Sequence, residues 1–395
     1  MKDNQATVTT DDVDNDKFGV TFGLEEEFFL VDPESRDLIA DPDPALFDAC
    51  ERDSGPHKVV HELLRTQIET NTRVCTSVSD LRTAQLETRS LVIDTAARFG
   101  AAVIASSTHP FAHWQAQAIT PKERYDRFAA TFQDVVRRYL VGGMHIHAGF
   151  GDAESRIRVM TALRRYLPIM HALSTSSPFN GGRETGFKSY RLTVIASMPR
   201  TNLPPPFRSR AEYDRLVADY QSMDFIGDGT ELWWDIRPAV RFPTIEVRIC
   251  DICPRMEDTL TIASLYACLI RWLLRQDAEE GLPPEPPTEL IAENRWHASR
   301  YGVLAFLGDL RAGKRVDILE GVEELVDDLA EDAAALDCER ELQRVTEIIR
   351  LGTGADRQID LYRLRRLEGD TIPEALRAVV DMVIAETREG VTDPP

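Results

Sequence analysis

Three consecutive glutamates, Glu25, Glu26 and Glu27, stand inside a segment that otherwise has the composition of a buried strand, "TFGLEEEFFLV" at residues 21–31. Aromatic and branched apolar residues on both sides favour a strand. Because strand side chains alternate between faces, Glu25 and Glu27 are expected on one face and Glu26 on the other. Two neighbouring carboxylates on one face repel each other unless a cation or hydrogen-bond donors offset their charge. The segment therefore predicts a buried strand that faces a cation site.

Two further stretches show the same alternation of polar and apolar residues. In "GGMHIHAGF", residues 142–150, His145 and His147 share one face of a predicted strand and could bind a metal or an anion. In "TIEVRIC", residues 244–250, Glu246 and Arg248 share a face. Each pattern also has a structural interpretation, because paired histidines occur on solvent faces and an acid beside an arginine can be a simple salt bridge. Between apolar neighbours such a pair is costly, which favours a functional role.

The remaining candidates complete an oxygen-rich site. Glu69 lies in a similar alternation in "HELLRTQIETNT", and Arg237 lies in "WWDIRP". Carboxylates with one imidazole suit Mg²⁺ or Mn²⁺ better than structural zinc, and arginines supply bidentate donors for phosphate or carboxylate. Metal ligands beside arginines indicate phosphoryl transfer. The candidate ligands are Glu25, Glu27, Glu69, His145 and Glu246, and the candidate arginines are Arg191, Arg237 and Arg248.

Other nucleotide and metal motifs are missing from the sequence. The phosphate-binding pattern GxxxxGK[ST] is absent, and so is GxGxxG, which argues against a dinucleotide-binding fold. Cys250 and Cys253 form a lone CxxC pair. Without a second pair, this spacing favours two small apolar residues at a strand end over a zinc or redox site.

The charge of the chain narrows its partners and its compartment. The formal net charge is −20, and only six of the 46 basic residues are lysines. Such an acidic surface should repel nucleic acid and anionic membranes. Acidic excess with little lysine indicates adaptation to a salty cytosol, although a GC-rich genome also favours arginine. The polar start and the lack of a long apolar run predict a cytoplasmic protein that does not span a membrane.

Composition shifts divide the 395 residues into four parts. Residues 1–16 are polar and are expected to form a disordered acidic tail. Residues 17–277 predict an α+β domain, 278–288 a proline-rich linker, and 289–395 a helical region that packs on that domain. Expected strands are 18–31, 57–71, 101–107, 143–150, 190–197, 231–237 and 244–250. Expected helices are 79–99, 121–140, 152–173, 209–222 and 256–275, and the chain beyond the linker is expected to be helical throughout.

Four motifs in order resemble the glutamate–cysteine ligase type 2 family, which includes carboxylate–amine ligases. They are "GLEEEFFLVD", "GMHIHAGF", "SPFNGGRETGFKSYR" and "TIEVRICD", and they span residues 23–251. The family is similar in fold to glutamine synthetase. The resemblance implies an α+β fold whose glutamine synthetase-like antiparallel β-sheet forms a funnel flanked by helices, with a helical C-terminal segment. With the acidic composition, it points to a salt-adapted, halophilic archaeal-type member.

The resemblance also implies an activity. It is the ATP-dependent joining of L-glutamate and L-cysteine through γ-glutamyl phosphate, with ATP and Mg²⁺ or Mn²⁺ bound and ADP and phosphate released. A different amine acceptor, a metal-dependent hydrolase and a non-catalytic nucleotide or amino-acid sensor are the alternatives, and a homo-oligomer is one option for assembly. Carried over residue by residue, the metal ligands are Glu25, Glu27, Glu69, His145 and Glu246; Glu246, Arg248 and Arg191 are catalytic; and His147, Arg237 and Arg191 lie near the nucleotide, with Arg191 and Arg237 binding either ATP or the amino-acid carboxylate.

Overall fold

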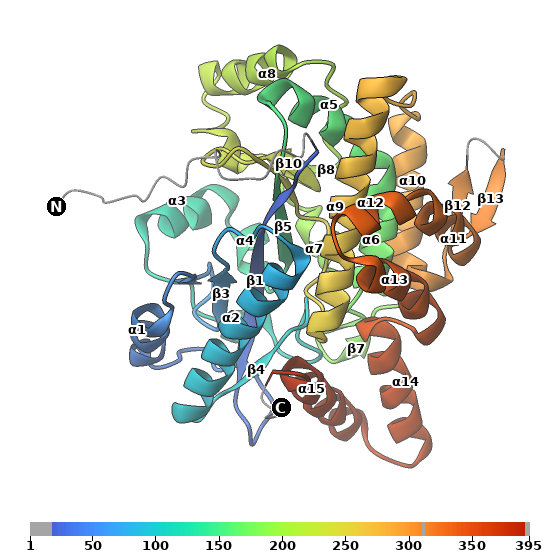
Figure 1. Cartoon of the computed structure of the whole chain (residues 1–395). Helices are drawn as coiled ribbons and strands as arrows, with labels where there is room; N and C mark the ends of the chain where they lie inside the picture. Colours follow the sequence, from blue (N-terminus) through green and yellow to red (C-terminus); the bar gives the residue numbers. More distant parts are fainter. Residues whose placement is uncertain (1–17, 310–312, 392–395) are drawn as a thin grey trace.

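A seven-stranded antiparallel sheet lies at the centre of the computed structural model, which describes residues 18–309 and 313–391 (Figure 1). The strand order is β10-β11-β5-β1-β3-β2, and β4 also pairs with β1. The predicted tail at residues 1–16 lies outside the described residues. The strands of this sheet are β1 Thr21–Val31, β2 Lys58–His61, β3 Gln67–Asn71, β4 Ala102–Ile104, β5 Met144–Gly149, β10 Ile236–Pro238 and β11 Thr244–Val247.

The two faces of the sheet differ as the alternation in β1 predicts. Burial alternates from Thr21 to Phe28, with Phe22, Leu24, Glu26 and Phe28 fully buried on one side. That apolar face packs in one core with the long helices α2, Val78–Arg98, and α9, Met256–Glu279. The opposite face carries the polar side chains of the site. The buried helices therefore fix the sheet from behind and leave its polar face for function.

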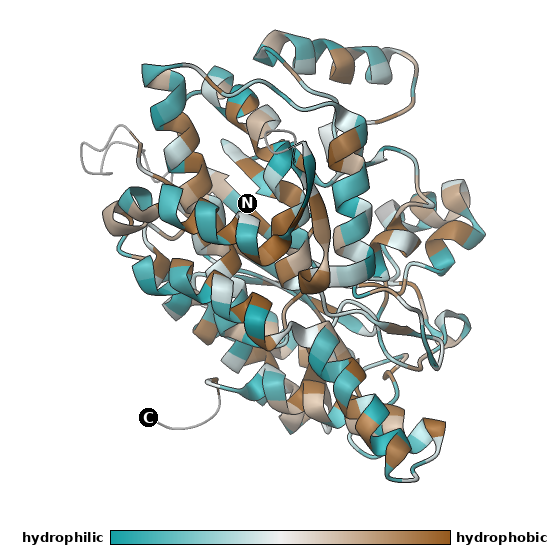
Figure 2. Cartoon of the chain, turned by 90° about the vertical axis from the view of Figure 1, so that its right-hand side faces the viewer, coloured by the Kyte–Doolittle hydropathy of each residue, from teal (hydrophilic) through white to brown (hydrophobic). Residues whose placement is uncertain are grey.

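The remaining elements surround this sheet. Figure 2 shows hydrophilic residues (teal) and hydrophobic residues (brown) on most helices, as expected for helices with one buried face. The other helices are α1 Pro44–Asp53, α3 Glu123–Phe132, α4 Asp134–Arg137, α5 Ala153–Leu163, α6 Leu167–Ser174, α7 Arg191–Ile195, α8 Arg210–Ser222, α10 Thr288–Tyr301, α11 Ile318–Asp328, α12 Ala330–Ala335, α13 Glu339–Leu351, α14 Gly354–Leu367 and α15 Ile372–Arg388. Short 3₁₀ turns lie at Trp114–Ala116, Arg164–Tyr166, Gly229–Glu231 and Gly302–Leu304, and three two-stranded ribbons pair β6 Phe179–Asn180 with β7 Arg183–Glu184, β8 Thr201–Asn202 with β9 Trp233–Trp234, and β12 Phe306–Asp309 with β13 Lys314–Asp317.

Several predicted elements are wrong or divided. The expected strand 190–197 is instead the short helix α7, whose buried residues Arg191, Leu192 and Ile195 follow a helical spacing rather than alternation. The expected strand 57–71 is two strands, because the chain reverses between β2 and β3. The expected helix 121–140 breaks at Gln133, whose φ is 50°.

Two more predicted elements fail for local reasons. The expected helix 152–173 tightens into a 3₁₀ turn before α6, where Pro168 starts a new helix. The C-terminal region is not helical throughout, because β12 and β13 form a hairpin that projects at the right edge of Figure 1.

The C-terminal helices pack against the elements that precede them. Helix α10 contacts α6, α13 contacts α9, and α15 contacts β4. The proline-rich segment between α9 and α10 is held down, since Arg164 binds Glu285 at 2.8 Å and Arg165 binds the carbonyl oxygen of Pro284 at 2.6 Å. Among the described residues, no helix combines the length and apolar character that crossing a bilayer requires.

Candidate active site

Five neighbouring strands bring seven of the nine predicted site residues onto the polar face, while Arg248 directly follows β11 and Arg191 begins helix α7. In the register of the sheet, Glu25 lies opposite His145, and Glu27 lies opposite Glu69. Strand β11 places Glu246 opposite His147 of β5 and opposite Arg237 of β10. Residues that are far apart in sequence thus meet because antiparallel strands align their same-face positions. The structure brings together all nine predicted residues, which are Glu25, Glu27, Glu69, His145, His147, Arg191, Arg237, Glu246 and Arg248.

The first group that could hold a metal ion consists of Glu25, His147 and Glu246. One ligand atom from each lies within 4.8 Å of the others. His147 Nε2 is 3.1 Å from one Glu25 oxygen, and His145 Nδ1 is 3.0 Å from the other. Burial on its own raises the pKa of Glu25, but hydrogen bonds with the two imidazoles bring that pKa well below its usual value. Glu25 is therefore an ionised carboxylate between two histidines.

The second group consists of three glutamates, Glu27, Glu62 and Glu69, whose ligand atoms also lie within 4.8 Å of one another. Burial, followed by the charge of Glu62, raises the pKa of Glu27 to about 8 and raises the pKa of Glu69 well above its usual value. Carboxylates this close cannot all ionise without a compensating charge. A divalent cation supplies that charge, and oxygen ligands are the ones that Mg²⁺ and Mn²⁺ prefer. The donor set of this group fits such an ion.

Three positively charged arginines, Arg191, Arg237 and Arg248, lie beside the first group. Arg248 and Arg237 both bind Glu246, with Arg237 Nε 2.8 Å from Glu246 Oε2. Burial raises the pKa of Glu246, but the two guanidinium groups outweigh burial and hold that pKa well below its usual value. Arg191 Nη1 donates to the carbonyl oxygens of Arg248 and Ile249, at 3.1 and 3.3 Å. Both carboxylate oxygens of Glu246 thus bind arginines. A metal ion at this carboxylate would share these oxygens with the guanidinium groups.

The two histidines lie on either side of Glu25. His145 is predicted to be a metal ligand and His147 to lie near the nucleotide, and in the structure His147 also lies within ligand distance of Glu25 and Glu246. His145 is buried, and burial and the neighbouring Arg248 lower its pKa to about 4, so its ring is neutral and can accept a hydrogen bond or a metal. Its Nε2 lies 3.9 Å from Glu27 Oε1, which places this ring between the two groups.

Two contributors to the candidate site do not follow from the sequence pattern. Glu62 lies in the turn between β2 and β3, where alternation no longer predicts direction, and only its short distance from Glu69 in sequence could have suggested it. Gly143 precedes the histidine strand, donates from its backbone N–H to Glu27 Oε2 at 2.6 Å and leaves room for Arg191. A Cβ at Gly143 would overlap Arg191 Nη2 and lie 2.9 Å from Arg191 Cζ. The glycine pair ahead of "MHIH" was the available signal.

Comparison with known proteins gives the same family over nearly the whole chain. The sequence model of Glutamate-cysteine ligase family 2 (GCS2) matches residues 21–381. A Rhodospirillum rubrum protein, provisionally named glutamate–cysteine ligase 2, is 44% identical over 370 residues, covering 93% of this chain and 95% of its own. A Jannaschia sp. protein with the same provisional name is 43% identical over 366 residues, covering 93% and 96%.

Solved structures share the fold at low sequence identity. The glutamate–cysteine ligase of Francisella tularensis, in complex with AMP, has a TM-score of 0.59 and 13% identity, covering 95% of this chain and 93% of that one. The bifunctional glutathione synthetase of Pasteurella multocida has a TM-score of 0.67 and 14% identity, and its match covers 94% of this chain and 53% of that one. The predicted α+β class, with a glutamine synthetase-like antiparallel sheet flanked by helices, is confirmed. The chain belongs to glutamate–cysteine ligase family 2.

Proposed function

We propose that this chain is an ATP-dependent ligase that joins the γ-carboxylate of L-glutamate to the amino group of L-cysteine and forms γ-glutamylcysteine. The observation that carries the proposal is the polar sheet face, where two adjacent groups of metal-type ligands lie beside three arginines. Hard divalent cations and guanidinium groups are the means by which proteins stabilise a transferring phosphoryl group. Membership in the family supports a carboxylate–amine ligase.

Divalent cations, Mg²⁺ or Mn²⁺, are proposed as cofactors of this site. One ion is assigned to Glu25, His147 and Glu246, and a second to Glu27, Glu62 and Glu69, with His145 between them. When bound, the ions neutralise the carboxylates and the phosphate oxygens of ATP.

The arginines and the substrates carry the proposed reaction. Arg248 and Arg237, both anchored on Glu246, face the phosphates, and Arg191 binds a phosphate or the amino-acid carboxylate. The γ-carboxylate of glutamate attacks the γ-phosphorus of ATP, and ADP leaves with the electrons of the broken P–O bond. The amine then attacks the acyl carbon of γ-glutamyl phosphate, loses a proton and expels phosphate. The protein orients charges and needs no nucleophile of its own.

One screen tests this proposal directly. Glutamate, ATP and Mg²⁺ are supplied with a panel of amines that includes cysteine, serine and 2-aminobutyrate, and ADP and ligated products are measured by mass spectrometry. We expect ADP release only when glutamate and an amine are both present, with cysteine among the best acceptors. A different best amine replaces cysteine and leaves a carboxylate–amine ligase. ADP release without an amine indicates a hydrolase, and nucleotide binding without any turnover indicates a sensor.

Replacing Gly143 with alanine is expected to lower ADP release by up to about 100-fold, because the new Cβ displaces the Arg191 guanidinium from its carbonyl partners. The effect on the free energy of unfolding should be small, about 1 kcal/mol, because a flexible side chain gives way rather than backbone. Steady-state kinetics and urea unfolding measure the two. Gly321→Ala, in α11 with its nearest neighbour atom at 3.7 Å, is the matched control and should leave ADP release unchanged. An unimpaired Gly143→Ala enzyme would argue against a role for Arg191.

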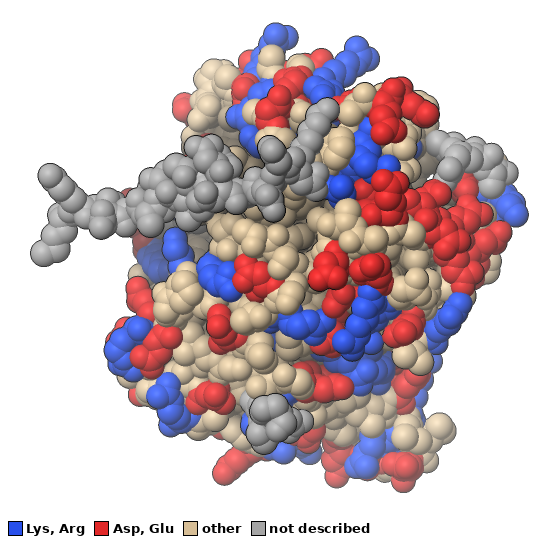
Figure 3. Space-filling model, in the orientation of Figure 1, with Lys and Arg blue, Asp and Glu red and all other residues tan. Residues whose placement is uncertain are grey.

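Salt adaptation is a separate proposal that rests on surface charge. Figure 3 shows acidic side chains gathered at the right edge, over α11 and α12. The archaeal origin has no support from the relatives above, which are bacterial. The exposed acids of these two helices are Glu320, Glu323, Glu324, Asp327, Asp328 and Glu331.

Lowering KCl from about 1 M to ~0.1 M is expected to lower the melting temperature, because the Debye length grows from ~3 to ~10 Å and repulsion among these acids returns. Thermal unfolding across a KCl series measures the effect. A double variant, Glu324→Gln with Asp327→Asn, should depend less on salt. A melting temperature that stays constant across the series would show that the acidity is incidental.

A further inference from the structure

Asp251 ends the "TIEVRICD" motif and is a fully buried carboxylate that the proposed reaction does not use. Each of its hydrogen-bond donors is neutral. Oδ2 accepts from the backbone N–H of Ser176 at 3.0 Å and from Ser177 Oγ at 2.7 Å, while Oδ1 accepts from Ser189 Oγ at 2.9 Å. Its own N–H donates to Ser174 Oγ at 3.1 Å. A buried carboxylate is costly, and three neutral donors offset only part of that cost. A buried carboxylate with this cost is therefore a candidate for a functional role.

The hydrogen bonds of Asp251 lead to Arg191. Ser177 Oγ, which donates to Asp251, accepts the backbone N–H of Arg191 at 3.2 Å. The guanidinium of Arg191 is held by the carbonyl oxygens of Arg248 and Ile249, which lie three and two residues before Asp251. Residues 248–251 thus hold Arg191 at two places. They bind its guanidinium directly, and they hold its backbone N–H through Asp251 and Ser177. Two fixed ends leave a long, flexible side chain few directions in which to point.

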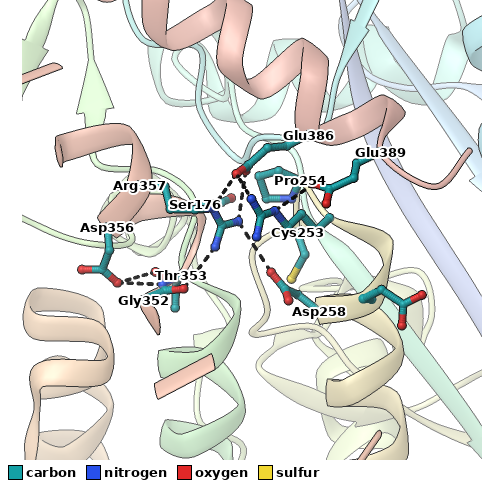
Figure 4. A network of polar contacts seen from close by, with 12 residues as sticks. Ser176, Cys253, Pro254, Asp258, Gly352, Thr353, Asp356, Arg357, Glu386 and Glu389 are labelled. Carbon is teal, nitrogen blue, oxygen red and sulfur yellow. Dashed lines mark hydrogen bonds and ion pairs between the residues drawn. The ribbon is translucent and has the colours of Figure 1, made fainter. Parts of the chain in front are cut away.

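The loop that carries Ser176, Ser177 and Ser189 is also held from outside. Helix α14 binds this loop at two points. Gln358 Nε2 donates to the carbonyl oxygen of Ser176 at 2.9 Å, and Lys188 Nζ lies 2.5 Å from Asp356 Oδ1. Figure 4 shows this end of α14, where Thr353 and Asp356 lie beside the ion-paired Arg357 and Glu386. Because α14 holds this loop in place, the hydrogen bonds between Asp251 and the loop can fix the position of Arg191.

We propose that Asp251 is a positioning residue that aims Arg191 at the transferring phosphoryl or carboxylate group through Ser177. The kinetic part of this inference rests on the proposed function. Asp251→Asn preserves shape but replaces one acceptor oxygen with a donor, so the hydroxyl groups around it must reorient. We expect kcat for ADP release to fall about tenfold or more, with a smaller change in KM for glutamate.

A double-mutant cycle separates positioning from general destabilisation. If Asp251 acts through Arg191, Asp251→Asn has almost no further effect on kcat in an Arg191→Ala background. Independent, multiplying effects would overturn the inference, and so would an Asp251→Asn enzyme with wild-type kcat. Asp332→Asn is the matched control: Asp332 is equally buried and bound by Arg275 at 2.8 Å, away from Arg191. It should lower stability without changing kcat.

Two serine variants keep the test decisive if Asp251→Asn does not fold. Ser177→Ala cuts the link between Asp251 and the Arg191 backbone, whereas Ser189→Ala removes another donor of the same carboxylate and leaves that link intact. Ser177→Ala should therefore lower kcat more than Ser189→Ala. Equal effects of the two variants on kcat would contradict the inference.

Hydrogen exchange gives a readout that does not depend on turnover. Amide exchange in residues 189–195, followed by mass spectrometry, should quicken in Asp251→Asn and Ser177→Ala but not in Asp332→Asn. If the wild-type chain releases no ADP with any amine, the proposed ligase function fails, and this exchange pattern alone decides whether Asp251 positions Arg191. Unchanged exchange in both variants would overturn the positioning role.

Discussion

Replacing Glu27 with glutamine is expected to lower ADP release by at least about 100-fold, because losing this proposed metal ligand would remove several kcal/mol of transition-state stabilisation. Glu27 lies within ligand distance of Glu62 and Glu69, and Gly143 fixes one of its oxygens through the backbone N–H. Glu25→Gln and Glu246→Gln should have effects of similar size. Initial rates at saturating Mg²⁺ measure the loss, and near-normal rates in all three variants would remove the metal assignment.

The same variant carries an opposite expectation for stability. The pKa of Glu27 in the folded protein is about 8, above its ordinary value of 4.5, because of burial and then the charge of Glu62. Between these two pKa values, Glu27 is protonated in the folded protein but ionised in the unfolded chain. The free energy of unfolding therefore falls as pH rises through this window. In metal-free protein, Glu27→Gln should make the free energy of unfolding depend less on pH. Added Mg²⁺ should abolish the same pH dependence in the wild type.

A matched control separates site chemistry from loss of charge. Glu257 is a partly exposed glutamate of α9 that pairs with Arg82 and lies outside both ligand groups. Glu257→Gln should leave ADP release unchanged. A loss of activity in this control would show that charge removal alone disturbs the enzyme.

Replacing Arg89 with methionine is expected to destabilise the fold by about 3–5 kcal/mol, because it leaves Glu26 as an unpaired buried charge. Arg89 and Glu26 are 0% and 1% exposed, and their closest contact, Arg89 Nη2 to Glu26 Oε1, is 2.5 Å. Arg89 also donates to the carbonyl oxygens of Cys253 and Pro254, at 2.9 and 2.7 Å. Urea unfolding of the metal-free protein measures the free energy.

The double variant distinguishes a stranded charge from lost packing. Adding Glu26→Gln to Arg89→Met removes the uncompensated carboxylate, so part of the lost stability should return. If the double variant is as unstable as Arg89→Met alone, the loss comes from the carbonyl partners of Arg89 rather than from Glu26.

Alternation along β1, β5 and β11 was enough to predict much of the site. It placed Glu25 and Glu27 on the face opposite Glu26, and it paired His145 with His147, because a strand has a period of two residues. It could not place Glu62, which lies in a turn without periodicity. It also left open why the chain keeps Glu26, since the partner Arg89 comes from a helix more than sixty residues away.

The failure at residues 190–197 has a related cause. The branched residues after Arg191 favour a strand locally, but the hydrogen bond from its N–H to Ser177 and the buried side of α7 favour a helix. Local propensity could not reveal the contacts of Asp251, which accepts hydrogen bonds from Ser177 and Ser189 of that loop and lies four residues after the end of β11. Tertiary contacts of this kind are invisible to periodicity.

The most direct test of the account follows the oxygen atoms of the proposed acyl phosphate. Glutamate labelled with ¹⁸O in its γ-carboxylate is incubated with the enzyme, ATP, Mg²⁺ and cysteine, and the released phosphate is examined by mass spectrometry. We expect each phosphate released with a γ-glutamyl product to carry one ¹⁸O from glutamate, because the bond that breaks joins the acyl carbon to that oxygen. Phosphate without label, formed alongside ADP, would contradict this expectation and would show that water accepts the phosphoryl group.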